Sequence, residues 1–138
     1  MQQRYGYPDT LRSTDNEIWG KLRTRFIRRI KHLQKHEKTL CNPYRGKSVC
    51  PDCEKEWPAE NQFTHGRFCW TTVFRHRVRK HNEYVSPLFW LYVMLATSDL
   101  PCGKYERKVL RAYKGSEVER IATDHFNFFL GAAKQRKR

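Results

Sequence analysis

The chain has 138 residues, the length of one ordinary domain, and it carries 28 lysines and arginines against 14 acidic residues, a formal net charge of +14. Hydrophobic residues make up 38% and aromatic residues 14%, which is enough apolar mass to bury a core and excludes a disordered tail. A charge balance this far from zero favours a polyanionic partner, and nucleic acid before any other.

The chain shows no sign of export or of membrane insertion. Residues 1–10 are polar, and the most apolar stretch, 88–96, is far below the roughly 20 residues that a membrane-spanning helix needs. Five cysteines without a secretory signal indicate a reducing compartment, where close cysteine pairs bind metal more often than they form disulfides. We therefore expect the protein inside the cell, in the nucleus or the cytoplasm, and not secreted.

The first half of the chain predicts an arm, a long helix and a cysteine-rich segment. Residues 1–13 are expected to be flexible. Thr14 with Glu17 forms a capping-box pattern, and apolar residues then recur at spacings of three and four to about Leu40, which predicts an amphipathic helix. After a turn at 42–46, the cysteine-rich segment 47–70 contains a second helix start at Pro58.

The second half predicts three more helices. Residues 71–79 fit a strand or a helix equally well. Ser86 and Pro87 begin a helix over 88–95 that is apolar on nearly all sides and should be the central buried element. A short helix is expected around 104–113. Ser116 and Glu119 form another capping box, and they begin a last helix that we expect Gly131 to end.

The predicted fold is therefore mostly α with a small ββα-like zinc-binding element. It forms one compact domain over residues 14–131 and ends in a basic tail at 132–138. We see no internal repeat.

The strongest pattern for chemistry is Cys50-x2-Cys53 followed by His65-x3-Cys69. Two cysteines two residues apart place both thiolates on one tight turn, which suits tetrahedral Zn²⁺, and residues four apart on a helix face the same way. We predict one structural zinc held by Cys50, Cys53, His65 and Cys69. Three neighbours can replace His65 or Cys69 as ligands, namely Cys41, His76 and His81. We interpret His32 and His36, which are also four apart, as a solvated pair.

Residues 49–57 resemble the knuckle of the two-cysteine, two-histidine zinc finger. Lys55 and Trp57 stand where that family has a Lys and an aromatic residue, and Phe63 stands where it has its core Leu. His65 matches the first family His, and Cys69 stands in place of the second. The resemblance covers about residues 49–69 and implies a ββα element that binds zinc.

The chain departs from that family in two respects. One residue instead of two separates Phe63 from His65, and the last ligand is Cys. The positions that read bases in the family hold Ala59, Gln62 and acids, which argues against sequence-specific DNA reading by this element.

Basic side chains gather in three tracts, at 21–38, 75–80 and 134–138. Aromatic residues border the second tract, an interleaving that suits RNA or single-stranded DNA, where rings stack on bases and arginines hold phosphates. We predict that nucleic acid contacts ten residues: Lys21, Arg25, Arg28, Arg29, Lys35, Trp70, Arg75, Arg77, Arg79 and Lys80. The tail at 134–138 resembles a nuclear import signal.

A much weaker resemblance covers Gly66–Thr72 and the basic patch after it. This segment is similar to part of the small basic non-capsid nuclear protein of bocaparvovirus-type viruses. It implies a nuclear accessory protein that acts in viral replication or RNA processing.

The sequence therefore predicts a small zinc protein that binds nucleic acid, with no small-molecule substrate and no membrane partner. We expect it not to be an enzyme, because no phosphate-binding Gly-rich loop and no nucleophile motif is present. A zinc-stapled adaptor for a protein partner is the alternative. A zinc-dependent nuclease, for which His81–Asn82 is the local hint, comes third.

Overall fold

The computed structural model describes residues 16–43, 48–57, 61–81, 83 and 85–136, and side chains within the range 22–132. The element order is α2 (Asn16–Gln34), β1 (Leu40–Pro43), β2 (Ser48–Val49), β3 (Glu56–Trp57), β4 (Asn61–His65), β5 (Phe68–Thr71), α3 (Thr72–His81), α4 (Pro87–Ala96), α5 (Lys104–Tyr113) and α6 (Glu117–Arg136). The predicted class, mostly α with a small ββα-like element able to hold a metal, is confirmed.

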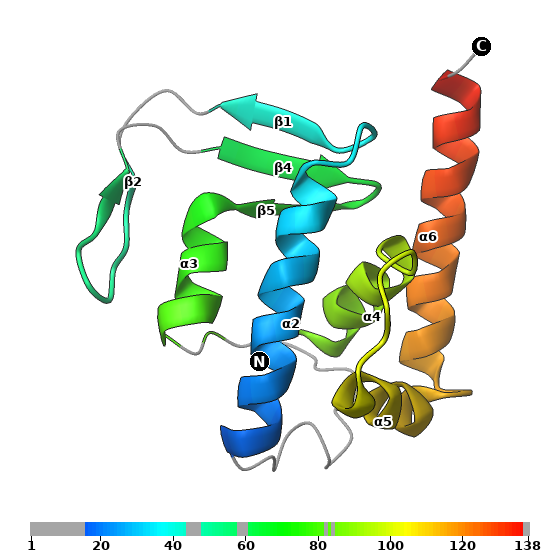
Figure 1. The fold of residues 1–138 in the computed structure, drawn as a ribbon. Coiled ribbons are helices and arrows are strands. Elements are labelled where there is room, and N and C mark those ends of the chain that lie inside the picture. The colour runs from blue at the N-terminus through cyan, green and yellow to red at the C-terminus, as the bar shows by residue number, and fades with distance from the viewer. Residues whose placement is uncertain (1–15, 44–47, 58–60, 82, 84, 137–138) are drawn as a thin grey trace.

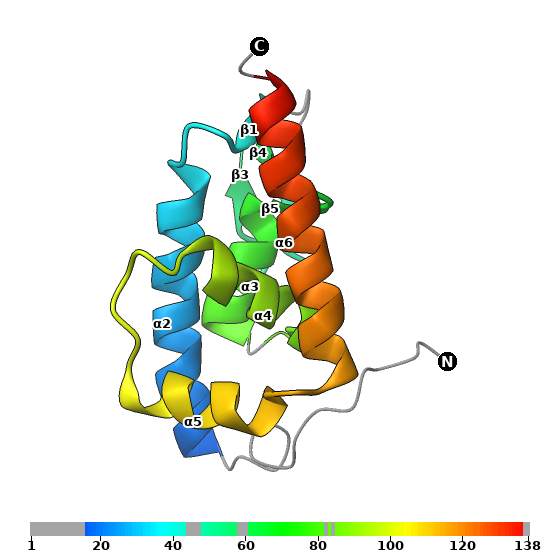
Figure 2. The ribbon, with the colours of Figure 1, turned by 90° about the vertical axis from the view of Figure 1, so that its right-hand side faces the viewer.

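Helix α4 forms the centre of the core, as its apolar sequence predicts. It packs against both α2 and α6 (Figure 2), and seven of its ten residues are buried. Ser86 is the N-cap, its hydroxyl accepting a hydrogen bond from the Phe89 amide, and Pro87 occupies the first turn. Leu22, Phe26, Ile30 and Leu33 of α2 supply the facing apolar stripe.

The structure contains two small antiparallel sheets, of which the larger lies across the upper end of α2 and α3 in Figure 1 and the smaller lies beside α3. β1, β4 and β5 form one sheet in that order, and β2 pairs with β3 in a separate hairpin. Strand β5 leads directly into α3, and the Thr71 hydroxyl caps that helix by accepting from the Phe74 amide. Residues 72–81 are thus helical, which decides the choice that the sequence left open.

The long first helix is shorter than predicted. It ends at Gln34 instead of continuing to Leu40, because the chain turns at 35–39 and the Thr39 hydroxyl donates to the Leu33 carbonyl, 2.6 Å away. Leu40 then pairs with Thr64 in the sheet. The spacing of apolar residues could not predict this strand, because the strand forms by pairing with residues 61–64, which are distant in the sequence.

The helix predicted after Pro58 is wrong. Residues 61–71 form the β4–β5 hairpin, whose two-residue turn places Gly66 at φ +60°. A Cβ at that position would lie 2.5 Å from the Tyr92 hydroxyl oxygen, so both the backbone and the packing require glycine. The stop predicted at Gly131 is also wrong, because α6 continues to Arg136. The capping position Thr14 lies outside the described residues.

Candidate metal centre and basic surface

The β2–β3 hairpin brings Cys50 and Cys53 together on a tight knuckle. The Cys50 amide donates to the Lys55 carbonyl at 2.8 Å, and the Glu54 amide donates to the Cys50 carbonyl at 2.9 Å. Glu54 adopts φ 60°, which closes the turn. Cys50 is fully buried and Cys53 is exposed. The turn therefore holds the Cys50 and Cys53 sulfurs close together.

Helix α3 places two imidazoles beside these sulfurs. The ligand atoms of Cys50, Cys53, His76 and His81 all lie within 4.8 Å of one another, and the Cys53 Sγ is 3.2 Å from the His76 Nε2. The Nε2 of His81 is buried and has no hydrogen-bond partner among the described residues. Because a buried ring nitrogen without a partner is costly, this atom is explained if it binds a metal ion.

The pKa values of Cys50 and His76 are shifted in the direction that favours metal binding. Burial tends to raise the pKa of Cys50, but the Asp52 and Cys53 amides and the Cys53 side chain outweigh it and hold that pKa below its usual value. Burial lowers the pKa of His76, helped by the nearby His81 and Lys55. A thiolate and a neutral imidazole are the forms that bind metal. The group could therefore hold a metal ion.

The structure replaces two of the four predicted ligands. His65 lies in the core, where its Nδ1 is 2.6 Å from the Tyr92 hydroxyl and its ring stacks on Phe129 at 3.8 Å. Cys69 is exposed on β5 and pairs with Thr64. The choice of His65 and Cys69 was wrong because it assumed a helix where the chain forms a hairpin. His76 and His81, which the sequence had left as alternatives, take their places.

The other candidates for metal binding lie elsewhere. Cys41 is exposed on β1, opposite Phe63. His32 pairs with the exposed Asp99 at 2.9 Å, and His36 packs edge-on against His65.

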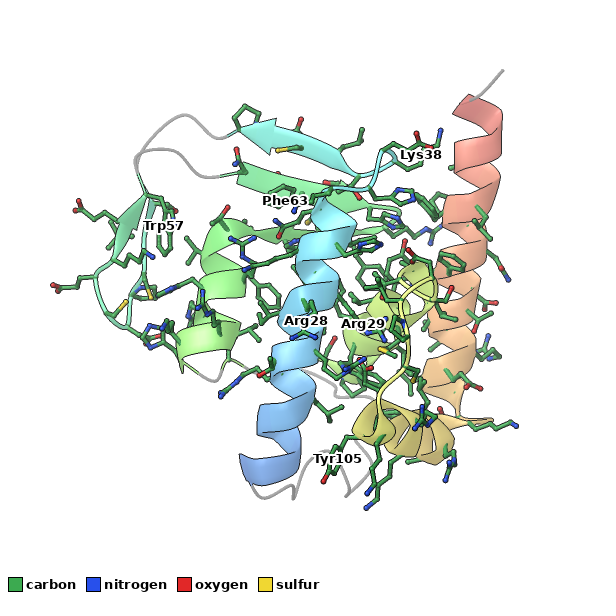
Figure 3. All side chains as sticks on the ribbon, in the orientation of Figure 1. Arg28, Arg29, Lys38, Trp57, Phe63 and Tyr105 are labelled. Atoms are coloured by element: carbon green, nitrogen blue, oxygen red, sulfur yellow. The ribbon has the colours of Figure 1, made fainter. Side chains whose placement is uncertain are left out.

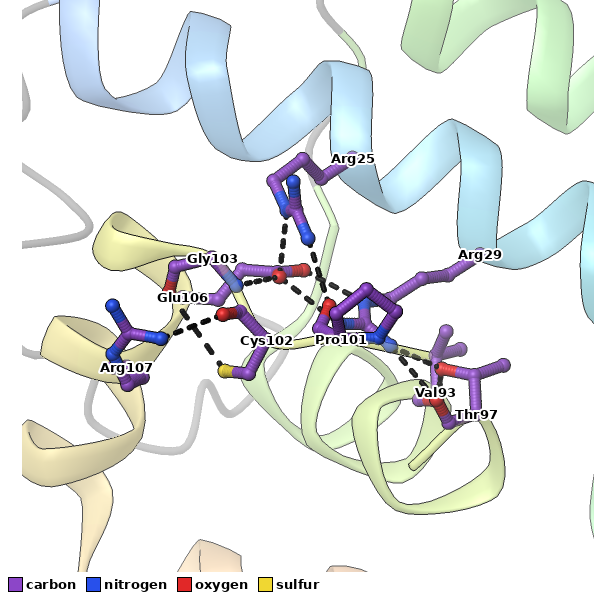
Figure 4. Close-up of polar contacts among 9 residues, drawn as sticks. All are labelled: Arg25, Arg29, Val93, Thr97, Pro101, Cys102, Gly103, Glu106 and Arg107. Atoms are coloured by element: carbon purple, nitrogen blue, oxygen red, sulfur yellow. Dashed lines mark hydrogen bonds and ion pairs between the residues drawn. The ribbon is translucent and has the colours of Figure 1, made fainter. Parts of the chain in front are cut away.

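Arg29, predicted to contact nucleic acid, is instead buried with 3% of its surface exposed. Its Nε lies 2.7 Å from Glu106, and its Nη1 donates to the Thr97 carbonyl and hydroxyl (Figure 4). Arg25 also binds Glu106 at 2.7 Å and the Pro101 carbonyl at 2.8 Å. The prediction was wrong for Arg29 and is weakened for Arg25, because both arginines are used to neutralise one buried acid.

Burial by itself raises the pKa of Glu106. The hydrogen bonds from Arg29, the Gly103 amide and Arg25 outweigh that effect and lower the pKa to about 2 from its ordinary 4.5. The carboxylate is therefore charged at neutral pH, and it ties α5 to α2.

Trp70 was predicted to stack on bases, but it is 4% exposed. Its indole Nε1 donates to Gln34 at 3.0 Å, and its ring stacks against Phe63. The prediction is wrong because β5 turns this side chain into the core.

The second basic tract is only partly free to bind. Arg77 pairs with Asp52 and with Glu83, at 3.2 and 3.1 Å. Arg75 is half-buried, and burial and the neighbouring Arg79 lower its pKa. Arg79 and Lys80 are exposed, as are Arg28 and Lys35 of α2. The side chain of Lys21 and those of the tail at 134–138 lie outside the described residues.

A groove of about 290 Å³ runs between α2 and α3. Its described lining contains four cations and no acid: Arg23, Thr24, Ile27, Arg28, Lys31 and Arg79. Arg28 is on the α2 helix, which in Figure 3 lies in front, between α3 and α5. Two tracts that are about fifty residues apart in sequence thus form one basic concavity. The sequence predicted Arg28 and Arg79 but not Arg23 or Lys31.

A second concavity, of about 260 Å³, is apolar. It lies between α4, α5 and α6, where Leu91, Met94, Leu110 and Ala122 line it and the Cys102 thiol is in its wall. Within the described part of the chain, no helix is long and apolar enough to cross a membrane.

Comparison of the chain with family models, with curated proteins and with solved structures gives no match.

Proposed function

We propose that this chain is a zinc-stabilised, non-catalytic protein that binds nucleic acid, with single strands of RNA or DNA as its ligands. The observation that carries the proposal is the basic groove between α2 and α3, whose described lining has four cations and no acid. The same helix α3 holds two of the candidate metal ligands. One ion would therefore hold in place the helix that forms one wall of the groove.

Zinc fits the donor set best. Two thiolates and two imidazoles in one cluster are the ligands of a tetrahedral structural zinc site. Four protein donors fill the tetrahedron and leave no position for an activated water. This supports a structural role for the ion and argues against the nuclease alternative.

The groove suits phosphate because three of the cations in its described lining are available. Among the described residues, Arg28, Lys31 and Arg79 have no hydrogen bond or ion pair, whereas Arg29 and Arg77 do. A concave basic surface between two packed helices follows one sugar–phosphate backbone, as in proteins that bind single strands. Because Trp70 is buried, it does not stack on bases, and the preference for single strands rests on the groove instead.

The nuclear location remains part of this proposal and rests on the sequence of the basic tail at 134–138. An accessory or regulatory role in a nucleus, including that of a virus-infected cell, is consistent with a small basic binding protein. We expect no membrane partner and no small-molecule substrate.

The test measures zinc content and RNA binding on one preparation of the full chain. We expect one zinc per chain, and binding of a labelled single-stranded oligonucleotide that weakens steeply as salt rises. Each phosphate contact on a single strand contributes about 0.7 to the slope of log affinity against log salt, so R28Q/R79Q should lower that slope by about 1.4. The control is R67Q/R120Q, which removes the same formal charge from the β4–β5 turn and from α6, where Arg120 is paired with Glu117 and Asp124.

Unchanged affinity and slope in a folded R28Q/R79Q protein would reject the groove as the binding surface. The same loss in R67Q/R120Q would show that net charge alone drives binding. Duplex DNA, single-stranded DNA and RNA of equal length should be compared in the same assay.

The adaptor alternative also has an observation in its favour, which is the apolar cavity between α4, α5 and α6. A protein interface of that kind loses little affinity at high salt, whereas phosphate binding loses much. Salt dependence therefore separates the two proposals.

A further inference from the structure

Helix α5 presents a basic face that the sequence analysis did not single out. Its exposed charged side chains, together with the residue that follows it, are all cationic: Lys104, Arg107, Lys108, Arg111 and Lys114. The helix has one acid, Glu106, which is 1% exposed and held by Arg25 and Arg29. Among the described residues, no acid pairs with a cation on the outer face of α5.

This arrangement is unfavourable in the free protein. Lys104 is the first residue of α5, where the helix dipole favours an anion instead of a cation. Lys104 with Lys108, and Arg107 with Arg111, are like charges four residues apart, and like charges at that spacing destabilise an exposed helix. A bound polyanion removes this repulsion. A phosphate backbone therefore binds this face more favourably than it binds a surface that carries both acidic and basic side chains.

A second hollow leads from the groove of the proposed function toward the loop that precedes α5. Arg28 lines that groove and also this smaller hollow of about 120 Å³, whose other walls are Arg25, Arg29, Leu100 and Pro101. Pro101 belongs to the loop that enters α5, and α5 packs against α2 (Figure 1). Arg28 therefore lies between the groove and the loop that leads into α5.

The charges around this hollow remain positive. Arg25, Arg29 and Glu106 together carry one net positive charge. The acid in the adjoining loop, Asp99, is paired with His32. A strand that crosses the hollow thus meets no unpaired acid among the described residues of its lining.

We infer that α5 is the second half of the binding surface, and that the ligand is one single strand that runs from the α2–α3 groove across Arg28 to α5. This inference rests on the proposed function and extends it. An unpaired strand can bend over three helices, whereas a duplex of this length is stiff. Binding therefore depends on strand length, because a short strand fills the groove alone.

The experiment compares labelled oligouridylates of about 5 and about 12 nucleotides, within the range of site sizes known for single-strand-binding folds. The variant is K108Q/R111Q in the zinc-loaded full chain. Both side chains are exposed and make no hydrogen bond or ion pair among the described residues, and Gln keeps the helix propensity. R28Q/R79Q and R67Q/R120Q are the comparison variants, and circular dichroism verifies folding in each.

We expect K108Q/R111Q to weaken the 12-mer and leave the 5-mer within about twofold of the wild type. Two contacts at about 0.7 each carry about 1.4 log units between 1 M and 0.1 M salt, so the 12-mer should bind about 25-fold more weakly at 0.1 M. R28Q/R79Q should weaken both strands, and R67Q/R120Q should weaken neither.

Three results would overturn the inference: no loss for the 12-mer in K108Q/R111Q, an equal loss for both lengths, or the same loss in R67Q/R120Q. If R28Q/R79Q still weakens both strands while K108Q/R111Q weakens neither, the inference fails and the proposed function stands. If neither variant weakens either strand, the proposed function fails with it.

Discussion

Arg28 and Arg29 are neighbours in sequence, yet the structure predicts opposite effects when each is replaced by Met. Arg29 is 3% exposed and bound to Glu106, Thr97 and Pro101, while Arg28 is exposed beside the groove. Removing one partner of a buried ion pair typically costs about 3–5 kcal/mol, because the other charge stays buried. We expect about 3 kcal/mol for Arg29→Met, the lower limit, since Arg25 remains 2.7 Å from Glu106.

The assay is urea denaturation followed by circular dichroism. With a slope of about 2 kcal/mol per molar urea, a loss of about 3 kcal/mol lowers the midpoint by about 1.5 M. Arg28→Met should change the free energy of unfolding by less than about 0.5 kcal/mol, while weakening RNA about fivefold at 0.1 M salt through one lost contact.

A double variant separates the ion pair from simple packing. Glu106→Gln keeps an oxygen that accepts from the Gly103 amide, which Glu106 now binds at 2.9 Å. R29M/E106Q should therefore be more stable than R29M alone, because no uncompensated carboxylate stays buried. The reasoning would be refuted if R29M unfolds at the wild-type midpoint, or if R28M and R29M lose stability equally.

The metal centre, the core and the tail give four further predictions. Cys53→Ser and His81→Gln should each release zinc and destabilise the protein, while Cys69→Ser should keep one zinc per chain. Metal analysis after gel filtration measures the zinc content of each variant. Loss of zinc from C69S would favour the ligand set predicted from the sequence. Trp70→Ala should lower the free energy of unfolding by about 3–5 kcal/mol in a thermal or urea melt, because the side chain is buried. The folded fraction should keep the wild-type ratio of single-strand to duplex affinity. Unchanged stability with a selective loss of RNA binding would contradict the burial of Trp70. Burial, and then the nearby His36, lower the pKa of His65 from 6.5 to about 4. Between these values the unfolded state binds more protons, so the free energy of unfolding should fall as pH drops from 6.5 to 4. A constant unfolding midpoint across that range would contradict the lowered pKa of His65. Deleting residues 134–138 should move a fluorescent fusion out of the nucleus, and an unchanged distribution would remove the nuclear assignment.

The sequence alone determined the features that depend on local chemistry. The Ser86–Pro87 helix start and the buried helix after it follow from a cap and an apolar run, and both are present. The short helix expected around 104–113 is present as well. The Cys50–Cys53 pair also followed from spacing, because two residues between thiols define one turn whatever surrounds it.

Only the tertiary structure decided how distant segments pair. The β4–β5 hairpin depends on contacts of Gly66 with Tyr92 and of β4 with β1, so the spacing of His65 and Cys69 fitted a helix that does not form. His76 and His81 become candidate ligands because β5 directs α3 toward the knuckle.

The arginines show both contributions. Arg28 and Arg29 are equivalent by charge and by helix propensity, and both are predicted from the sequence to contact nucleic acid. Helical spacing already separates them, because Arg29 lies seven residues after Leu22 and four before Leu33, within the apolar stripe, whereas Arg28 lies outside it. Glu106, 77 positions after Arg29, meets one of them and not the other. Charge can be counted from a sequence, but whether a charge is available depends on which acid the fold brings within hydrogen-bond distance, and that is a property of the packed helices.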